Sequence, residues 1–477
     1  MEALCDGRCL PLEIRAVSRH TRTQPVKVSV SVTDGTPATA LLGGLLHCAV
    51  ETLHLDAVSA PDLLRALAGL QDEGKSWDAI ADLTLTLVED GYVPHRLPAR
   101  LRYLKVIDQE DACSGDTTLP CLPDTPEELD LSEAGIKLPS APLPVGVSLR
   151  LGKSAAAALQ NPVATDGVKK LCLFLDDTFD APERLPPGLV HLEVQDYADS
   201  NPTGNTLPPL PHTLRELDLS AACIQSGPLP PHLTSLSTSQ DSGEPIGDLP
   251  ITLERLAVNA AFEQRLGHLP ACLKVITSDL DDDVEFDQLF GELPPQLQVL
   301  DLISFSEFNQ HLDALPCHLL KLTLGCGSDQ PLGTLPDTLE ELLFYDGFPG
   351  SIFNHPLGTL PKSLRKLRLS DAFDHPLGLL PSKLEYLECM VSQPLAPLPC
   401  SLQHLLIWNS AYHHDLGALP PSLVELRILP AVPGEDGAYQ HRLQPIHPSL
   451  KAVAISRDYA YLDDLAGVKL AHNDMRH

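Results

Sequence analysis

The sequence is short of basic and of aromatic residues. It has 33 Lys and Arg against 64 Asp and Glu, a formal net charge of −31, and aromatic residues are only 5% of its 477 residues. So acidic a chain argues against binding to nucleic acid or to anionic membranes, which require a basic surface. The charge suits a partner that, if charged, is basic, and solubility alone accounts for it equally well. Leucine must fill most of the core, because large rings are scarce.

Features of secreted and membrane proteins are also missing. No stretch reaches the ~18 uninterrupted apolar residues of a membrane span. The first residues include Glu2, Asp6 and Glu13 and form no apolar core of a signal peptide. The 12 cysteines are scattered without a C-x-x-C pair, which is typical of reduced thiols. We therefore expect a cytoplasmic, intracellular protein with no membrane span.

Motifs of catalysis are absent as well. The sequence has no G-x-S-x-G, phosphate loop, H-E-x-x-H or dinucleotide fingerprint. The acidic run 279–283 lacks the spacing of an EF-hand and is interpreted as a solvated loop. We expect no catalytic residue, cofactor or metal site, although an enzyme with an unrecognised site stays a second alternative.

What the sequence has is a repeated phrase. Its clearest copy runs from Phe353 to Leu369, and a second copy opens at Phe373. The skeleton is Leu-Pro-x-x-Leu-x-x-Leu-x-Leu, a polar turn, and Phe-(Asn/Asp)-(His/Gln)-Pro-Leu-Gly. A period of about 20 residues indicates a solenoid. The Leu-Pro starts are Leu97, Leu122, Leu185, Leu210, Leu229, Leu249, Leu269, Leu293, Leu315, Leu335, Leu360, Leu380, Leu398 and Leu419, with degenerate copies near Pro142, Ala164 and Ile446.

The Leu-x-Leu pair alternates with period two, so both leucines point to one side of a strand. Stacked repeats then form a parallel sheet. The predicted fold is an α/β repeat solenoid, with a curved parallel β-sheet like that of leucine-rich repeats and a mostly irregular, helix-poor convex side. We divide the chain into an N-terminal cap region at 1–45, longer repeats with a helix near Pro61–Leu70 at 46–96, Leu-Pro repeats at 97–455, and a C-terminal cap or tail at 456–477.

Three further columns precede each Leu-Pro. An aromatic residue stands seven positions before it and predicts a buried spine. A glycine stands two before it and indicates a backbone geometry that a Cβ would block. A Gln or His stands five before it; because the two types alternate, the column predicts a hydrogen-bonding ladder and not a metal site.

The N-terminus offers a weaker signal. Residues 9–14 resemble the opening of an F-box, the helical module that docks onto ubiquitin-ligase scaffolds. The following run 26–32 alternates apolar and polar residues and predicts a strand instead. A cap over the first open face of the solenoid is the alternative.

The phrase from Phe353 to Leu369 resembles the FNIP repeat, a leucine-rich-repeat variant known in amoeboid protists and in giant viruses that infect them. A viral origin would place the protein in the host cytoplasm. Members of that family often carry an N-terminal F-box. The Leu-Pro rhythm is also similar to the recognition half of bacterial secreted ubiquitin ligases, but no Cys follows the last repeat here, so their catalytic domain is not expected.

Function is predicted to lie on the concave face, at positions six, eight and ten after each Leu of Leu-Pro. Early repeats have plain polar residues there, whereas late repeats have the aromatic, Met and Arg side chains typical of interface centres. We predict a non-catalytic scaffold for an unidentified protein partner, or alternatively a substrate-recognition subunit of an SCF-type ubiquitin ligase bound to its adaptor. The candidate partner-binding residues are Leu343, Tyr345, Arg368, Tyr386, Met390, Leu406, Trp408, Arg427 and Leu429.

Overall fold

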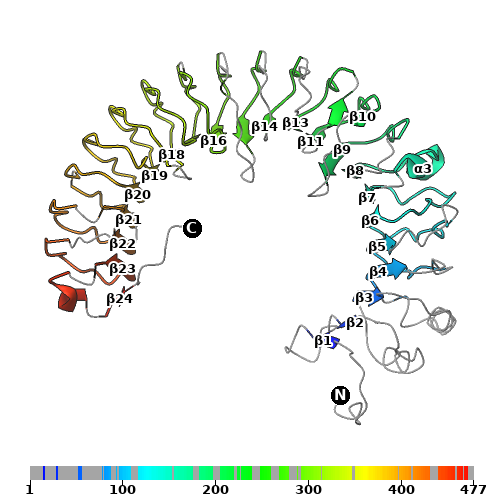
Figure 1. Ribbon diagram of the computed structural model, residues 1–477, viewed down its shortest axis with the longest axis horizontal. Coiled ribbons are helices and arrows are strands. Elements are labelled where there is room, and N and C mark those ends of the chain that lie inside the picture. The colour runs from blue at the N-terminus through cyan, green and yellow to red at the C-terminus, as the bar shows by residue number, and fades with distance from the viewer. Residues whose placement is uncertain are drawn as a thin grey trace, which may run out of the picture. The chain divides into compact units, whose positions relative to one another are not determined.

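The protein is shown as a computed structural model in Figure 1. The structure describes residues 14–16, 28–30, 52–55, 78, 80–87, 93, 96–108, 117–152, 155–175, 182–196, 205–219, 223–225, 227–238, 248–258, 268–278, 287, 292–312, 314–345, 350–395, 397–409, 412–429, 439–456, 459–465 and 467–470. The chain divides into two compact units, unit 1 at Met1–Leu233 and unit 2 at Thr234–His477.

Unit 1 contains a parallel sheet in which each strand pairs with the next one along the chain. Its order is β3 (Thr52–Leu55), β4 (Asp82–Leu87), β5 (Tyr103–Asp108), β6 (Glu128–Glu133), β7 (Ser148–Leu151), β8 (Lys170–Leu175), β9 (His191–Asp196) and β11 (Glu216–Leu219). A small parallel pair joins β10 (Asn205–Leu207) to β12 (Cys223–Gln225).

In unit 2 the strands again pair in parallel, each with the next one along the chain. Its strands are β13 (Ser235–Thr238), β14 (Arg255–Val258), β15 (Val275–Ser278), β16 (Val299–Leu302), β17 (Lys321–Leu324), β18 (Glu341–Phe344), β19 (Lys366–Arg368), β20 (Tyr386–Cys389), β21 (His404–Ile407), β22 (Glu425–Ile428), β23 (Ala452–Ile455) and β24 (Lys469–Leu470). Because β24 continues the sheet beyond β23, part of the predicted cap or tail is a strand.

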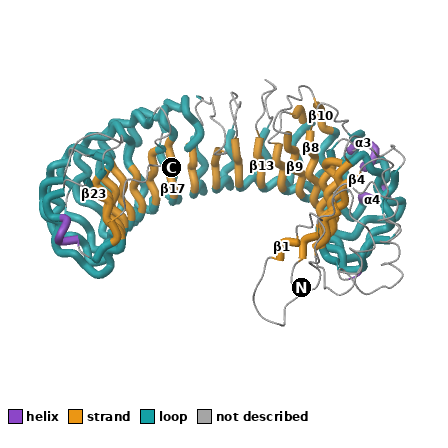
Figure 2. Tube along the Cα trace, turned by 60° about the horizontal axis from the view of Figure 1, so that its bottom comes forward, coloured by secondary structure: helices purple, strands orange, loops and turns teal. Residues whose placement is uncertain are grey.

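The predicted repeat starts are confirmed. From Leu97 onward a strand begins six residues after every predicted start, as β19 does after Leu360, and the degenerate copies give β7, β8 and β23 in the same way. The described part is thus a parallel β-solenoid, mostly strands and loops, as Figure 2 shows.

Helix is scarce. The described helices are α3 (Ala155–Leu159) and α4 (Pro162–Thr165), and the 3-10 helix η4 spans Leu462–Leu465. The helix predicted near Pro61–Leu70 lies outside the described residues, and α3, α4 and η4 are each five residues or shorter. At the N-terminus β1 (Ile14–Ala16) pairs antiparallel with β2 (Val28–Val30), which confirms the strand predicted within 26–32.

The core is a stack of leucines. In β18 the buried residues Leu342 and Phe344 alternate with Glu341 and Leu343, which point to the other face of the sheet. Every strand of unit 2 from β13 to β22 has such a fully or almost fully buried Leu or Ile at its second position. Burying one such side chain stabilises the fold by about 1.5–3 kcal/mol.

Neighbouring repeats are joined by two ladders of polar contacts. The first occupies the position three residues after the Leu of Leu-Pro. There the Thr338 hydroxyl donates to the carbonyl oxygens of Cys317 and Leu319, both at 2.8 Å, and the Ser363 hydroxyl repeats this contact one repeat later. Each hydroxyl thus satisfies backbone carbonyl oxygens of the preceding repeat that lie outside the hydrogen-bonded strand of that repeat.

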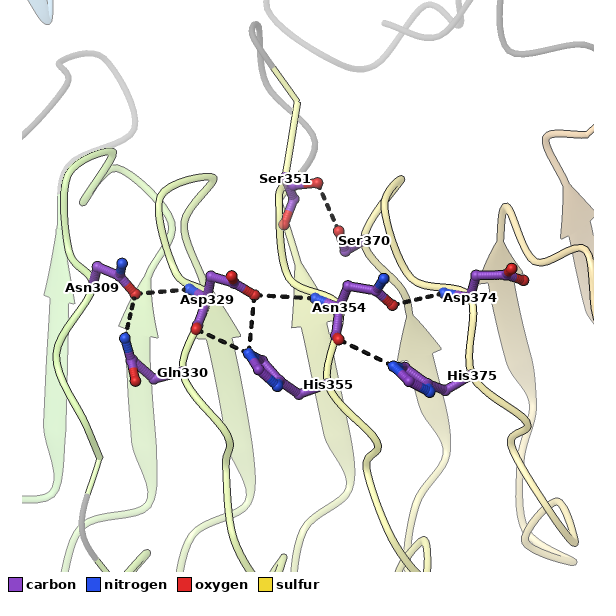
Figure 3. Close-up of polar contacts among 9 residues, drawn as sticks. All are labelled: Asn309, Asp329, Gln330, Ser351, Asn354, His355, Ser370, Asp374 and His375. Carbon is purple, nitrogen blue, oxygen red and sulfur yellow. Dashed lines mark hydrogen bonds and ion pairs between the residues drawn. The ribbon is translucent and has the colours of Figure 1, made fainter.

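The second ladder explains the polar columns before Leu-Pro and is drawn in Figure 3. An Asn or Asp six residues before Leu-Pro accepts the backbone N–H of its counterpart in the next repeat: the Asn354 Oδ1 lies 3.0 Å from the Asp374 N. The neighbouring His375 places its Nε2 3.1 Å from the Asn354 carbonyl oxygen. His355 and His414 make the same backbone contact, which confirms the hydrogen-bonding role predicted for this column, whereas Gln330 donates to the Asn309 side chain.

The aromatic and glycine columns are also confirmed where they are described. Phe308, Phe353, Phe373 and Tyr412 are buried, and Tyr439 and Tyr459 continue the row with stacked rings. In the tyrosine repeats each hydroxyl accepts a backbone N–H of the preceding repeat. Gly358 and its counterparts Gly333, Gly378 and Gly417 have φ between 65° and 68°, in the left-handed region that favours glycine. Phe262 and Phe286 lie outside the described residues.

Removal of one side chain from the second ladder should weaken the fold measurably. Asn354→Ala leaves the Asp374 N–H without its acceptor, and we expect a loss of about 0.5–1.5 kcal/mol in the free energy of unfolding. Asn354→Asp is the matched control, because Asp329 and Asp374 already play this part in their own repeats. Urea denaturation of both variants checks the prediction, and equal losses would contradict it.

Candidate protein-interaction site

The nine predicted partner-binding residues lie on one face of the sheet in unit 2. They come from β18 to β22 or directly follow those strands, and their side chains alternate with the core leucines. The register places Leu343, Arg368, Glu388, Leu406, Arg427 and Ala454 opposite one another in a single row. We call this row, together with the residues two positions before and after it on each strand, the concave face of unit 2. The corresponding face of the other sheet strands is the concave face of unit 1. The name reflects the curve that the repeats of each unit follow, because the strands lie on the inner side of that curve (Figure 1).

The exposure expected for three of the nine residues is wrong. Leu406, Trp408 and Leu429 are only 8%, 6% and 5% exposed, and with Ala454 they form a packed cluster. Tyr386 and Met390 are partly buried against that cluster. The physical reason is the narrow spacing of paired strands, about 4.8 Å, which brings large side chains at equivalent positions into contact.

A buried carboxylate organises this cluster, and it was not among the predicted residues. Glu388, only 5% exposed, accepts the indole N–H of Trp408 at 2.7 Å on Oε1 and the hydroxyl of Tyr386 at 2.6 Å on Oε2. The Arg368 Nε lies 3.4 Å from the Glu388 Oε2. Burial, followed by the hydrogen bond to Glu388, raises the pKa of Tyr386, which therefore keeps its proton and remains a donor. Three donors thus compensate one desolvated charge.

Further charges flank the cluster. The Glu425 carboxylate pairs with Arg427 at 2.7 Å and with His404 at 3.1 Å. Burial alone would raise the pKa of Glu425, but the hydrogen bonds from Arg427 and His404 outweigh it and lower that pKa. The Lys366 Nζ lies 5.1 Å from the centre of the Tyr386 ring, within the range of a cation–π contact.

The concave face of unit 1 is polar, as the early repeats predicted. Arg150 lies between Glu128 at 3.6 Å and Asp130 at 3.9 Å and stacks over Phe174. His191 pairs with Glu216 at 2.8 Å.

Two titratable groups on that face have shifted pKa values. The hydrogen bond to Glu193, reinforced by Glu216, raises the pKa of His191. Burial beside Glu193 raises the pKa of the Cys172 thiol to about 12, so this thiol stays protonated and is a poor nucleophile.

No group of three or more His, Cys, Asp or Glu side chains is placed to hold a metal ion within the part of the chain that the structure describes. Among the described residues, no helix combines the length and the apolar character that a membrane crossing requires. The acidic run 279–283 lies outside the described residues, but Asp287, which follows it, takes part in the second ladder by accepting the Asn309 N–H at 3.0 Å.

The comparison with family models agrees with the repeat phrase. The family model described as FNIP Repeat matches residues 353–388. Among solved structures, YopM from Yersinia enterocolitica WA-314 is similar over 82% of this chain and 86% of that one, at 23% identity and a TM-score of 0.47. No curated protein sequence matches this chain significantly. The family model covers the copy of the phrase that runs from Phe353 to Leu369, and residues 353–388 of this chain match the FNIP repeat.

Proposed function

We propose that this protein is a non-catalytic scaffold that binds a protein partner on the concave face of unit 2, over β18 to β22. The observation that carries the proposal is the pre-organised cluster around Glu388. Hydrogen bonds fix the Tyr386 and Trp408 rings, so binding would cost little side-chain entropy. Arg, Tyr and Trp are also the residues most often found at the energetic centres of interfaces.

Exposed groups surround the fixed cluster. Tyr345 is 39% exposed at the β18 end of the face, and Arg368, His404 and Arg427 have partly exposed side chains. A partner would contact these groups first, with the edges of Tyr386 and Met390 as the apolar floor between them. Leu406, Trp408 and Leu429 pack against that floor and hold it in place.

The two alternatives have less support. The ubiquitin-ligase role depends on a helical F-box, whereas the described residues near the N-terminus are the paired strands β1 and β2. An enzyme would need titratable groups that converge on a pocket, whereas those of this face are paired along rows of strands.

The described cysteines are free thiols, which fits the reducing cytoplasm in which we place the protein.

Site-specific photo-crosslinking tests the proposal. A benzophenone amino acid in place of Tyr345 should give a discrete cross-linked partner in an extract of the native cell. The same amino acid in place of Tyr461, which is equally exposed at 38% but lies in the last turn of unit 2, should not. Equal labelling from both positions, or none from Tyr345, would refute the concave face as the binding surface.

A further inference from the structure

Resting on the proposed function, we infer that the partner segment recognised by this concave face carries a carboxylate beside a large apolar side chain. The inference concerns the chemistry of the partner and depends on which charges of the face remain accessible. It differs from the expectation that net charge alone provides, which is a basic partner.

The carboxylates of β20 and β22 are already engaged by donors of the face itself. Glu388 is buried, with a side chain 7% exposed, and three donors already occupy its oxygens. Glu425 is shared between Arg427 and His404. A basic segment would therefore have to compete with existing ion pairs for every carboxylate on β20 and β22.

Two cationic side chains of the face still have donor groups that a partner could engage. Among the described residues, Lys366 has the Tyr386 ring as its contact and no carboxylate within ion-pair distance. Arg427 pairs with Glu425 through its Nε, and its side chain is 29% exposed, which leaves the Nη atoms of the guanidinium for a second acceptor. These two groups stand on either side of the Tyr386–Met390 floor, on β19 and β22.

The overall charge of −31 does not reverse this local preference. At physiological ionic strength, charges more than about 8 Å away are largely screened. A carboxylate that reaches the face meets either Lys366 or Arg427 at contact distance, and a neighbouring apolar side chain covers the Tyr386–Met390 floor. Such charge-assisted contacts are stronger than neutral ones when partly desolvated.

A peptide-display selection on the 477-residue chain tests the inference. The probe is a library of random peptides of about a dozen residues, the length of an extended segment that crosses several strands. We expect the enriched peptides to place Asp or Glu next to Leu, Met, Phe or Trp. Binding of the best peptide should fall about 10-fold or more in Lys366→Glu, and replacement of the peptide's acidic residue by Arg should recover binding to that variant.

Two further variants keep the result interpretable. Lys362→Glu makes the same charge change at an exposed site in the Leu-Pro turn of the same repeat and should change binding less than about 2-fold. Lys366→Gln takes the place of Lys366→Glu if the reversed charge lowers the melting temperature.

Two outcomes would refute the inference. Enriched peptides that are basic or uncharged but lose affinity in Tyr345→Ala would overturn this inference and leave the proposed function standing. Peptides insensitive to every concave-face substitution would overturn both.

Discussion

Glu388→Ala is expected to lower the free energy of unfolding by about 3–5 kcal/mol, the usual cost of removing one partner from a buried ion pair. The substitution removes the acceptor of the Trp408 indole N–H and of the Tyr386 hydroxyl, and it removes one carboxylate from the surroundings of Arg368. Urea denaturation followed by tryptophan fluorescence reports directly on this cluster, because Trp408 belongs to it.

Two controls separate the buried charge from its surroundings. Glu388→Gln keeps one acceptor oxygen and the side-chain volume, so a smaller loss is expected. Glu385→Ala removes a carboxylate from the same repeat, but that side chain is 40% exposed and pairs with Arg365, and a loss of at most about 1 kcal/mol follows. Losses of equal size for Glu388→Ala and Glu385→Ala would mean that Glu388 does not organise the cluster.

The second large effect is expected in the aromatic column. Phe353→Ala should cost about 3–5 kcal/mol, because it opens a cavity in a fully buried stack. The Phe353 ring centre lies 4.3 Å from that of Phe344 and 6.5 Å from that of Phe373, to which it is parallel. Both neighbouring repeats therefore lose contacts when the ring is removed.

The adjacent residue provides the matched control for that experiment. Ile352 is 51% exposed, so Ile352→Ala should change the free energy of unfolding by no more than about 0.5 kcal/mol. Thermal unfolding of the two variants side by side is sufficient. The structural role of the column would be refuted if Phe353→Ala unfolded at the same temperature as Ile352→Ala.

The sequence predicted the repeat framework because the framework is local and periodic. The strand positions, the buried Phe353 and Phe373, the left-handed Gly358 and the hydrogen-bonding His375 each depend on a pattern within one repeat. The Asn and Asp column was visible in the same phrase, but its bonding role was missed, because the donor lies about 20 residues away in the next repeat.

The hydrogen-bonded cluster at the centre of the candidate site could not be predicted from the pattern within one repeat. Glu388, Tyr386 and Trp408 stand at ordinary alternating positions, and the hydrogen bonds of Glu388 depend on the register between β20 and its neighbours. The burial of Trp408 follows from the same cross-strand packing and not from its own repeat. The signal in the sequence was a Glu eight residues after the Leu of Leu-Pro, with Tyr and Trp at nearby concave positions. Its role as a shared acceptor follows only when the register between β20 and its two neighbouring strands is known.

The most direct test of the proposed division between binding face and structural frame compares two exposed apolar side chains. Tyr345 stands on the concave face and Ile352 in the following turn, 39% and 51% exposed. The dissociation constant of the selected peptide should rise about 10-fold or more in Tyr345→Ala and less than about 2-fold in Ile352→Ala. Equal changes in the two variants, or the larger change in Ile352→Ala, would contradict binding on the concave face.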